Sequence, residues 1–191
     1  MWKYLLSFVL ITPVLLLNGC ATVIDVVTSE PIYVHPGKRT LGAKIDDSQI
    51  ETIGKVNLHK ADEGLFEGRV KVTSYNGVVL ITGQVETAQL RQLAGDTINK
   101  ITRVRKVHNE LEVGSIVPVS TRSYDTWLTT KIKSKMILNS AIPAGRVKVI
   151  TENKTVFLMG MLSRHEADNA TEAARTTRGV RKVVRVFEYI D

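Results

Sequence analysis

Histidines, paired carboxylates and one cysteine are the side chains of this 191-residue chain that could do chemistry. The four histidines are His35, His59, His108 and His165. They are far apart and lack the short spacing of a metal site. The sequence contains no serine-histidine-aspartate order, nucleophile elbow or glycine-rich phosphate loop. Asp46 and Asp47 fit a cap at a helix start better than acid–base catalysis. We therefore expect no enzyme activity, catalytic residue, metal, cofactor or small-molecule substrate.

Cys20 is the only cysteine, and it ends an apolar run over residues 5–17 that follows a single early charge, Lys3. The run is too short to span a bilayer comfortably and has the length typical of a signal peptide. The ending Leu-Asn-Gly-Cys resembles a lipobox, in which the cysteine is acylated and becomes the mature N-terminus. We expect a signal peptide over residues 1–19 and lipidation, including palmitate, at Cys20. Ala21 favours sorting to the outer membrane, and an uncleaved anchor is the alternative.

One helix of the second half places an aromatic ring beside basic residues. At about 100° per residue, Leu128, Ile132 and Met136 form a stripe that should face the core, and Trp127 lies roughly 140° from its centre. Lys131, Ser134 and Leu138 share the side of Trp127, and Lys133 and Lys135 flank it in sequence. An exposed tryptophan beside lysines suits a membrane interface. The alternative is an indole that packs against the other half of the protein.

The elements that position this helix belong to a unit that occurs twice. Arg69-Val-Lys-Val recurs as Arg146-Val-Lys-Val at an offset of 77 residues, and Gly83 recurs as Gly160. Trp127 aligns with Gln49, so the repeated fold itself does not require an aromatic residue there. Few insertions over so long a stretch indicate a duplication.

Each copy predicts the order α-β-β-α-β, which suits an α+β module: a three-stranded sheet with two helices on one face. The tight turns fall at Asn76-Gly77 and Asn153-Lys154. Gly83 and Gly160 indicate a bulge or a close approach of two segments. The predicted elements of the first copy are a helix over 46–58, strands over 69–74 and 78–85, a helix over 86–101 and a strand over 106–113. Those of the second are a helix from 123 or 125 to 138, strands over 146–151 and 155–162, a helix over 164–177 and a strand over 183–190.

These elements divide the chain into five parts. They are a signal peptide (1–19), an acylated N-terminus with a flexible tether (20–44), module 1 (45–113), a linker (114–120) and module 2 (121–191). As flexible coil the tether spans about 25–30 Å, so the modules can reach back to the membrane that holds Cys20.

The positive charge of the chain lies in its second half. Lys and Arg number 9 against 10 Asp and Glu over residues 45–113, but 13 against 7 over residues 121–191. A secreted lipoprotein rarely meets nucleic acid, so we expect an anionic phospholipid surface as partner and no nucleic acid. A second basic group comprises Arg175, Arg178, Arg181, Lys182 and Arg185. We interpret it as a solvated end of the module, with a supporting lipid contact as the alternative.

The duplicated pattern resembles the BON domain family. The match is carried by residues 147–160, with their Val-Phe-Leu-Met-Gly ending, and by Gly179-Val-Arg-Lys-Val. The order of lipobox, tether, module and module is similar to the outer-membrane lipoproteins of that family that carry two such domains. The resemblance implies a non-enzymatic periplasmic protein that binds anionic phospholipid through the first helix of its second module, here the helix with Trp127, and that supports outer-membrane integrity. A link to the outer-membrane protein assembly machinery and to division sites is also implied.

The sequence is therefore compatible with two functions. The first is phospholipid binding through Trp127, Lys131, Lys133, Ser134, Lys135 and Leu138. The second is a protein adaptor that docks on an outer-membrane assembly or division complex through the same surface, with Trp127 as its main contact. Lipid binding should weaken steeply with salt, whereas a protein interface centred on tryptophan should tolerate it.

Overall fold

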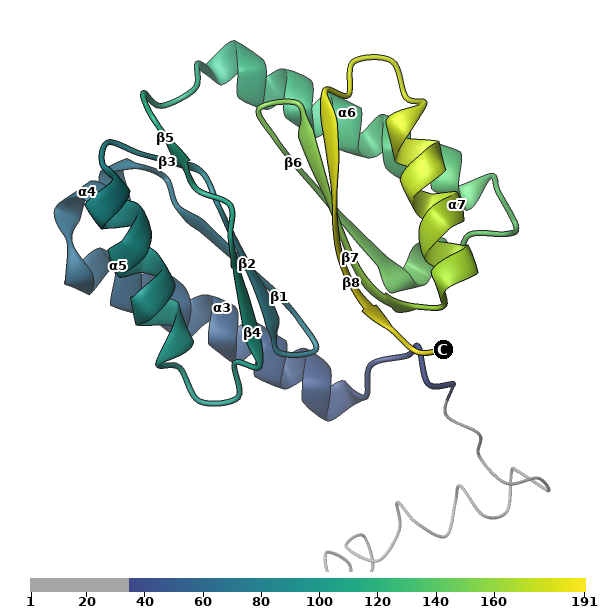
Figure 1. Cartoon of the computed structure of the whole chain (residues 1–191), viewed down its shortest axis with the longest axis horizontal. Coiled ribbons are helices and arrows are strands. Elements are labelled where there is room, and N and C mark those ends of the chain that lie inside the picture. The colour runs from purple at the N-terminus through teal and green to yellow at the C-terminus, as the bar shows by residue number, and fades with distance from the viewer. Residues whose placement is uncertain (1–34) are drawn as a thin grey trace, which may run out of the picture. The chain divides into compact units, whose positions relative to one another are not determined.

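The computed structural model describes residues 35–191. The predictions for residues 1–34, namely the signal peptide, acylation at Cys20 and most of the tether, lie outside the described residues. Residues 36–191 form one compact unit, which contains two α+β modules (Figure 1). Each module has a three-stranded sheet and its main helices on one face, so the predicted fold class is confirmed.

Module 1 has its three main strands in the order β1-β2-β4. Strands β1 and β2 are antiparallel, and β4 joins β2 in parallel after a helical crossover. A short parallel pair, β3 and β5, extends this sheet beyond Gly83, where φ is 129°. The elements are α3 (Leu41–Ala61), α4 (Glu63–Glu67), β1 (Lys71–Tyr75), β2 (Val78–Thr82), β3 (Gln84–Val85), α5 (Ala88–Asn99), β4 (Lys106–Asn109) and β5 (Glu112–Val113).

Module 2 repeats this topology with longer strands, in the order β6-β7-β8. The hairpin of β6 and β7 is antiparallel, and β8 pairs with β7 in parallel over its whole length. The elements are α6 (Val119–Ile137), the 3₁₀ turn η2 (Ala144–Arg146), β6 (Val147–Glu152), β7 (Thr155–Leu162), α7 (Arg164–Arg175) and β8 (Lys182–Tyr189).

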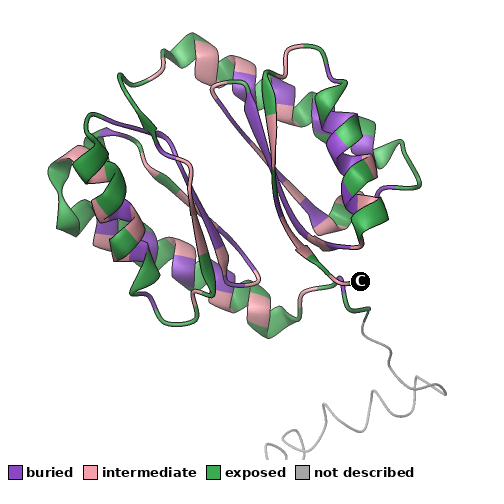
Figure 2. Ribbon diagram, viewed as in Figure 1, coloured by how far each residue is buried: buried purple, intermediate pink, exposed green. Residues whose placement is uncertain are grey.

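Three apolar clusters hold the compact unit together. One lies between sheet and helices in each module, where helix positions that face the strands are buried (Figure 2). The third lies between the two sheets and joins Tyr75 and Leu80 of module 1 to Phe157, Met159 and Val186 of module 2. Helices cover one face of each sheet and the other module covers the other face. The strands therefore consist of continuous apolar runs, such as the Val-Phe-Leu-Met of β7. The two modules therefore share a core.

The hairpin turns fall where the sequence predicts them. Asn76 and Gly77 have φ values of 54° and 74°, and Asn153 and Lys154 have φ values of 48° and 61°. Two successive residues with positive φ match the twist of the flanking strands. Gly160 lets the hairpin close, since a Cβ there would stand 2.5 Å from the carbonyl oxygen of Arg146.

The predicted start of the first helix in each module is wrong, because the aspartates taken as caps have another role. Helix α3 begins at Leu41, inside the predicted tether, with Thr40 as its N-cap. Helix α6 begins at Val119, inside the predicted linker. Asp47 and Asp125 consequently lie beyond the first turn, where both are buried.

These two aspartates anchor the hairpin turns. Asp47 accepts hydrogen bonds from the backbone N–H groups of Asn76 and Gly77 at 2.8 and 2.9 Å. Asp125 accepts from those of Asn153 and Lys154 at 2.7 and 2.8 Å. Turn amides of this conformation need an acceptor when they are buried, and the carboxylates supply it. The duplication has preserved the contact in both modules.

Candidate functional site

The outer side of α6 is the candidate site, and burial of the opposite side positions it. Leu128, Ile132 and Met136 are fully buried against the sheet, as the periodicity predicts. Trp127 points away from them, with 51% of its surface exposed. The alternative, an indole enclosed by module 1, does not agree with this exposure.

Trp127 is held by neighbours on its own helix. Its ring lies 5.3 Å from the ring of Tyr124, tilted by 37°. The ammonium of Lys131 lies 4.8 Å from the indole centre, which is within the range of a cation–π contact. An aromatic ring and a cation are thus paired at an open surface.

Three further predicted residues lie on the same side as Trp127. Lys131, Ser134 and Leu138 are all exposed, and Leu138 has 87% of its surface open to solvent. We name Trp127, Lys131, Ser134 and Leu138 the Trp127 stripe. The sequence interpretation missed Tyr124, Val119 and Ile137, of which the last two are also exposed apolar side chains. Val119 and Ile137 are 18 residues apart, which is five helical turns. This spacing could have shown that they lie on the same side of the helix.

Lys133 and Lys135 do not join the stripe. They lie roughly 120° and 80° around the helix from Trp127, on opposite sides. Lys133 is exposed, while the ammonium of Lys135 donates to Oγ1 of Thr176, just after α7, at 2.6 Å. The structure therefore brings Lys131 to the indole and places the other two lysines at the edges of the helix surface.

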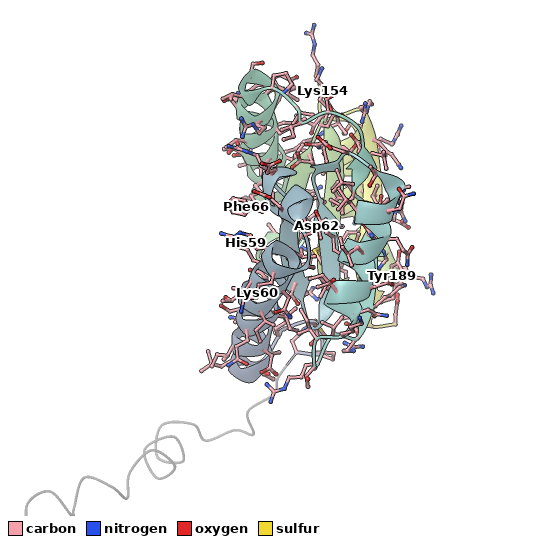
Figure 3. The ribbon with its side chains drawn as sticks, turned by 90° about the vertical axis from the view of Figure 1, so that its left-hand side faces the viewer. His59, Lys60, Asp62, Phe66, Lys154 and Tyr189 are labelled. Atoms are coloured by element: carbon pink, nitrogen blue, oxygen red, sulfur yellow. The ribbon has the colours of Figure 1, made fainter. Side chains whose placement is uncertain are left out.

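Charge pairs also join the two modules. Arg105 binds Glu188 at 2.7 Å, and its counterpart Arg181 binds Glu112 at 3.4 Å. The Arg105 guanidinium lowers the pKa of Glu188 from its ordinary value. With the shared core, these paired contacts place α3 and α6 along one side of the compact unit (Figure 3).

The basic group at the end of module 2 is largely paired within the protein. Arg175 binds Glu172 at 2.9 Å, Arg181 binds Glu112, and Arg185 binds Asp168 at 2.6 Å. Only Arg178 and Lys182 of this group form no ion pair with the residues that the structure describes. Three of its five cations are therefore paired with carboxylates inside the compact unit.

Across residues 35–191, histidines, cysteines and carboxylates do not gather in groups of three that could hold a metal. The same residues contain no helix with the length and apolarity needed to cross a bilayer. The described site presents an exposed indole beside a lysine ammonium.

The repeated fold agrees with the family comparison. The BON domain model matches residues 46–115 and 124–191. The chain belongs to the BON domain family, and it carries two copies of the domain.

Relatives cover most of the chain. It is 36% identical over 183 residues to the outer membrane lipoprotein DolP of Haemophilus influenzae, which covers 96% of this chain and 95% of that protein. It is 41% identical over 152 residues to a 21 kDa hemolysin of Actinobacillus pleuropneumoniae, covering 80% and 78%. It is 29% identical over 153 residues to the osmotically inducible protein Y of Escherichia coli, covering 78% and 76%. The near full-length relationship identifies the chain as an outer-membrane lipoprotein with BON domains.

Proposed function

We propose that module 2 binds anionic phospholipid through the Trp127 stripe while Cys20 holds the protein, without enzymatic activity, at the periplasmic side of the outer membrane. The observation that carries the proposal is the half-exposed indole with the Lys131 ammonium 4.8 Å from its centre. Indole rings settle at headgroup depth, where lysine meets lipid phosphate. We further propose that residues 1–19 are removed and that Cys20 is acylated.

The strength of this contact suits an anchored protein. A basic residue near an anionic surface contributes about 1 kcal/mol, so a single helix binds weakly by itself. An acyl anchor raises the local concentration of the helix at the membrane, so weak contacts become sufficient. The anchor supplies attachment, and the helix then selects where in the leaflet the protein resides.

Lipid composition and salt test this proposal. We expect fragment 36–191, the compact unit without its anchor, to co-sediment with phosphatidylglycerol vesicles and not with phosphatidylcholine vesicles. Raising the salt from 0.1 to 1 M shortens the screening length from about 10 to about 3 Å, so binding should fall steeply. Equal binding to both kinds of vesicle, or binding that salt leaves unchanged, would contradict it. No binding to either would favour docking on a protein complex through the same surface.

A further inference from the structure

A hollow of about 630 Å³ lies between the two modules, close to the start of α6. It is lined by residues of α3, α4 and β1 from module 1 and by Arg122 from the first turns of α6. His59 and Phe66, which border it, point outward on the side of the unit where α3 and α6 run (Figure 3). The hollow therefore opens on the side of the unit along which α3 and α6 run.

Three cations in the hollow lack an acidic partner. Lys55, Arg69 and Arg122 line it, and none of them forms an ion pair within residues 35–191. The Nε atom of Arg122 is also buried without a hydrogen-bond acceptor in this part of the chain. Because Arg122 lines the hollow and has no carboxylate partner among these residues, an anion in the hollow would pair favourably with its guanidinium.

The carboxylates of the hollow do not cancel these charges. Glu152 is 7% exposed and already binds Lys71 at 3.0 Å and the amide of Gln84 at 3.2 Å. Glu67 is exposed at the edge. The four lysines and arginines therefore outnumber the two glutamates, and the hollow is positive.

The duplication shows that the unpaired state of Arg69 is particular to module 1. Arg146, the counterpart of Arg69, binds Glu166 and donates to the carbonyl of Met161. Glu166 is the third residue of α7, and the third residue of α5 is Leu90. Arg69 thus lacks the acid that neutralises its counterpart, although the fold is the same.

An apolar wall stands beside the cations. Phe66 is 57% exposed and stacks on His59 with ring centres 4.2 Å apart, and Ile116 is exposed nearby. A free phosphate would leave this wall in water, whereas a phosphate that carries hydrocarbon would cover it.

We propose that the hollow binds one anionic phospholipid, with its phosphate at Arg122 and Arg69 and its first acyl carbons against Phe66 and Ile116. This inference rests on the proposed function, because the Trp127 stripe brings this side of the protein to the membrane. The protein then contacts lipid in two ways: the Trp127 stripe contacts the membrane surface, and the hollow holds one lipid molecule.

Short-chain lipids test the hollow separately from membrane binding. We expect dihexanoyl phosphatidylglycerol, below its micelle concentration, to give saturable NMR shifts at hollow residues of fragment 36–191. Dihexanoyl phosphatidylcholine and glycerol phosphate should bind more weakly, since one adds a cation and the other lacks hydrocarbon. Arg122→Gln should weaken lipid binding by about tenfold, the cost of a charge-assisted hydrogen bond. Arg69→Gln should weaken it in the same direction.

Arg178→Gln is the matched control, because Arg178 is exposed and makes no ion pair with the described residues; it should bind the lipid as the wild type does. The proposal is overturned if the lipid gives no saturable shifts, if Arg122→Gln binds equally well, or if glycerol phosphate binds as tightly as the lipid. Trp127→Glu should keep the shifts at the hollow. Lipid in the hollow without vesicle binding would refute only the proposed function, and vesicle binding with an empty hollow would refute only this inference.

Discussion

Replacing Trp127 with glutamate should reduce binding of fragment 36–191 to phosphatidylglycerol vesicles by roughly thirtyfold. The change removes the interfacial ring and puts a carboxylate against an anionic surface, which together cost about 2 kcal/mol. Vesicle titration at low salt measures the effect. The fold should be unaffected, because Trp127 is outside all three apolar clusters.

Two further variants make this result specific. Gln89→Glu introduces the same charge at an exposed position of α5, which lies away from α6, and should bind as the wild type does. Trp127→Phe keeps an aromatic ring and should retain most of the binding. Equal loss in Gln89→Glu and Trp127→Glu would show that net charge, not the Trp127 stripe, controls binding.

Replacing Asp47 with alanine should destabilise the protein by about 3–5 kcal/mol, the cost typical of breaking a buried charged network. Its carboxylate is 3% exposed and accepts from the hydroxyl of Ser74, from two turn amides and from Arg39 at 2.6 Å. Urea unfolding followed by circular dichroism measures the loss. Asp46→Ala is the control, because Asp46 makes only a solvent-exposed pair with Arg103, and it should change stability by less than about 1 kcal/mol. Similar losses in the two variants would contradict the anchoring role of Asp47.

The contribution of Asp47 should also depend on pH. Burial by itself would raise its pKa, but hydrogen bonds from Gly77, Ser74, Arg39 and Asn76 outweigh burial and hold the pKa below its ordinary value of 3.8. A lowered pKa in the folded state means that the charge stabilises the protein fully above the unfolded pKa, and that this stabilisation is lost as the pH falls through the folded pKa. The stability gap between wild type and Asp47→Asn should be constant near neutral pH and should narrow below about pH 4.

The sequence could predict the repeated unit and the orientation of α6, because both follow from local pattern. Strand alternation, the Asn76 and Asn153 turns and the buried stripe of α6 need no knowledge of distant contacts. The residue of module 1 that aligns with Trp127 is Gln49. The sequence could therefore also indicate that Trp127 is a surface residue and not one that the core requires. These features are properties of single helices, strands and turns.

The starts of α3 and α6 and the hollow could not be predicted in this way. Asp47 has the composition of a helix cap, and only the packed structure shows that it reaches a turn about 30 residues away. Lys55 lies on α3, Arg69 in the turn before β1 and Arg122 on α6, so their shared surface exists only after the modules pack. Helix α4, which contains Phe66, is only five residues long, so it has no recognisable hydrophobic periodicity.

The fluorescence of Trp127 reports whether its indole enters the membrane interface. The chain has two tryptophans, Trp2 and Trp127, so fragment 36–191 contains Trp127 as its single indole reporter. With phosphatidylglycerol vesicles we expect its emission to shift to shorter wavelength and to be quenched by lipids brominated near the headgroup. An emission spectrum that stays unchanged and unquenched while the fragment co-sediments with those vesicles would contradict a membrane contact through Trp127.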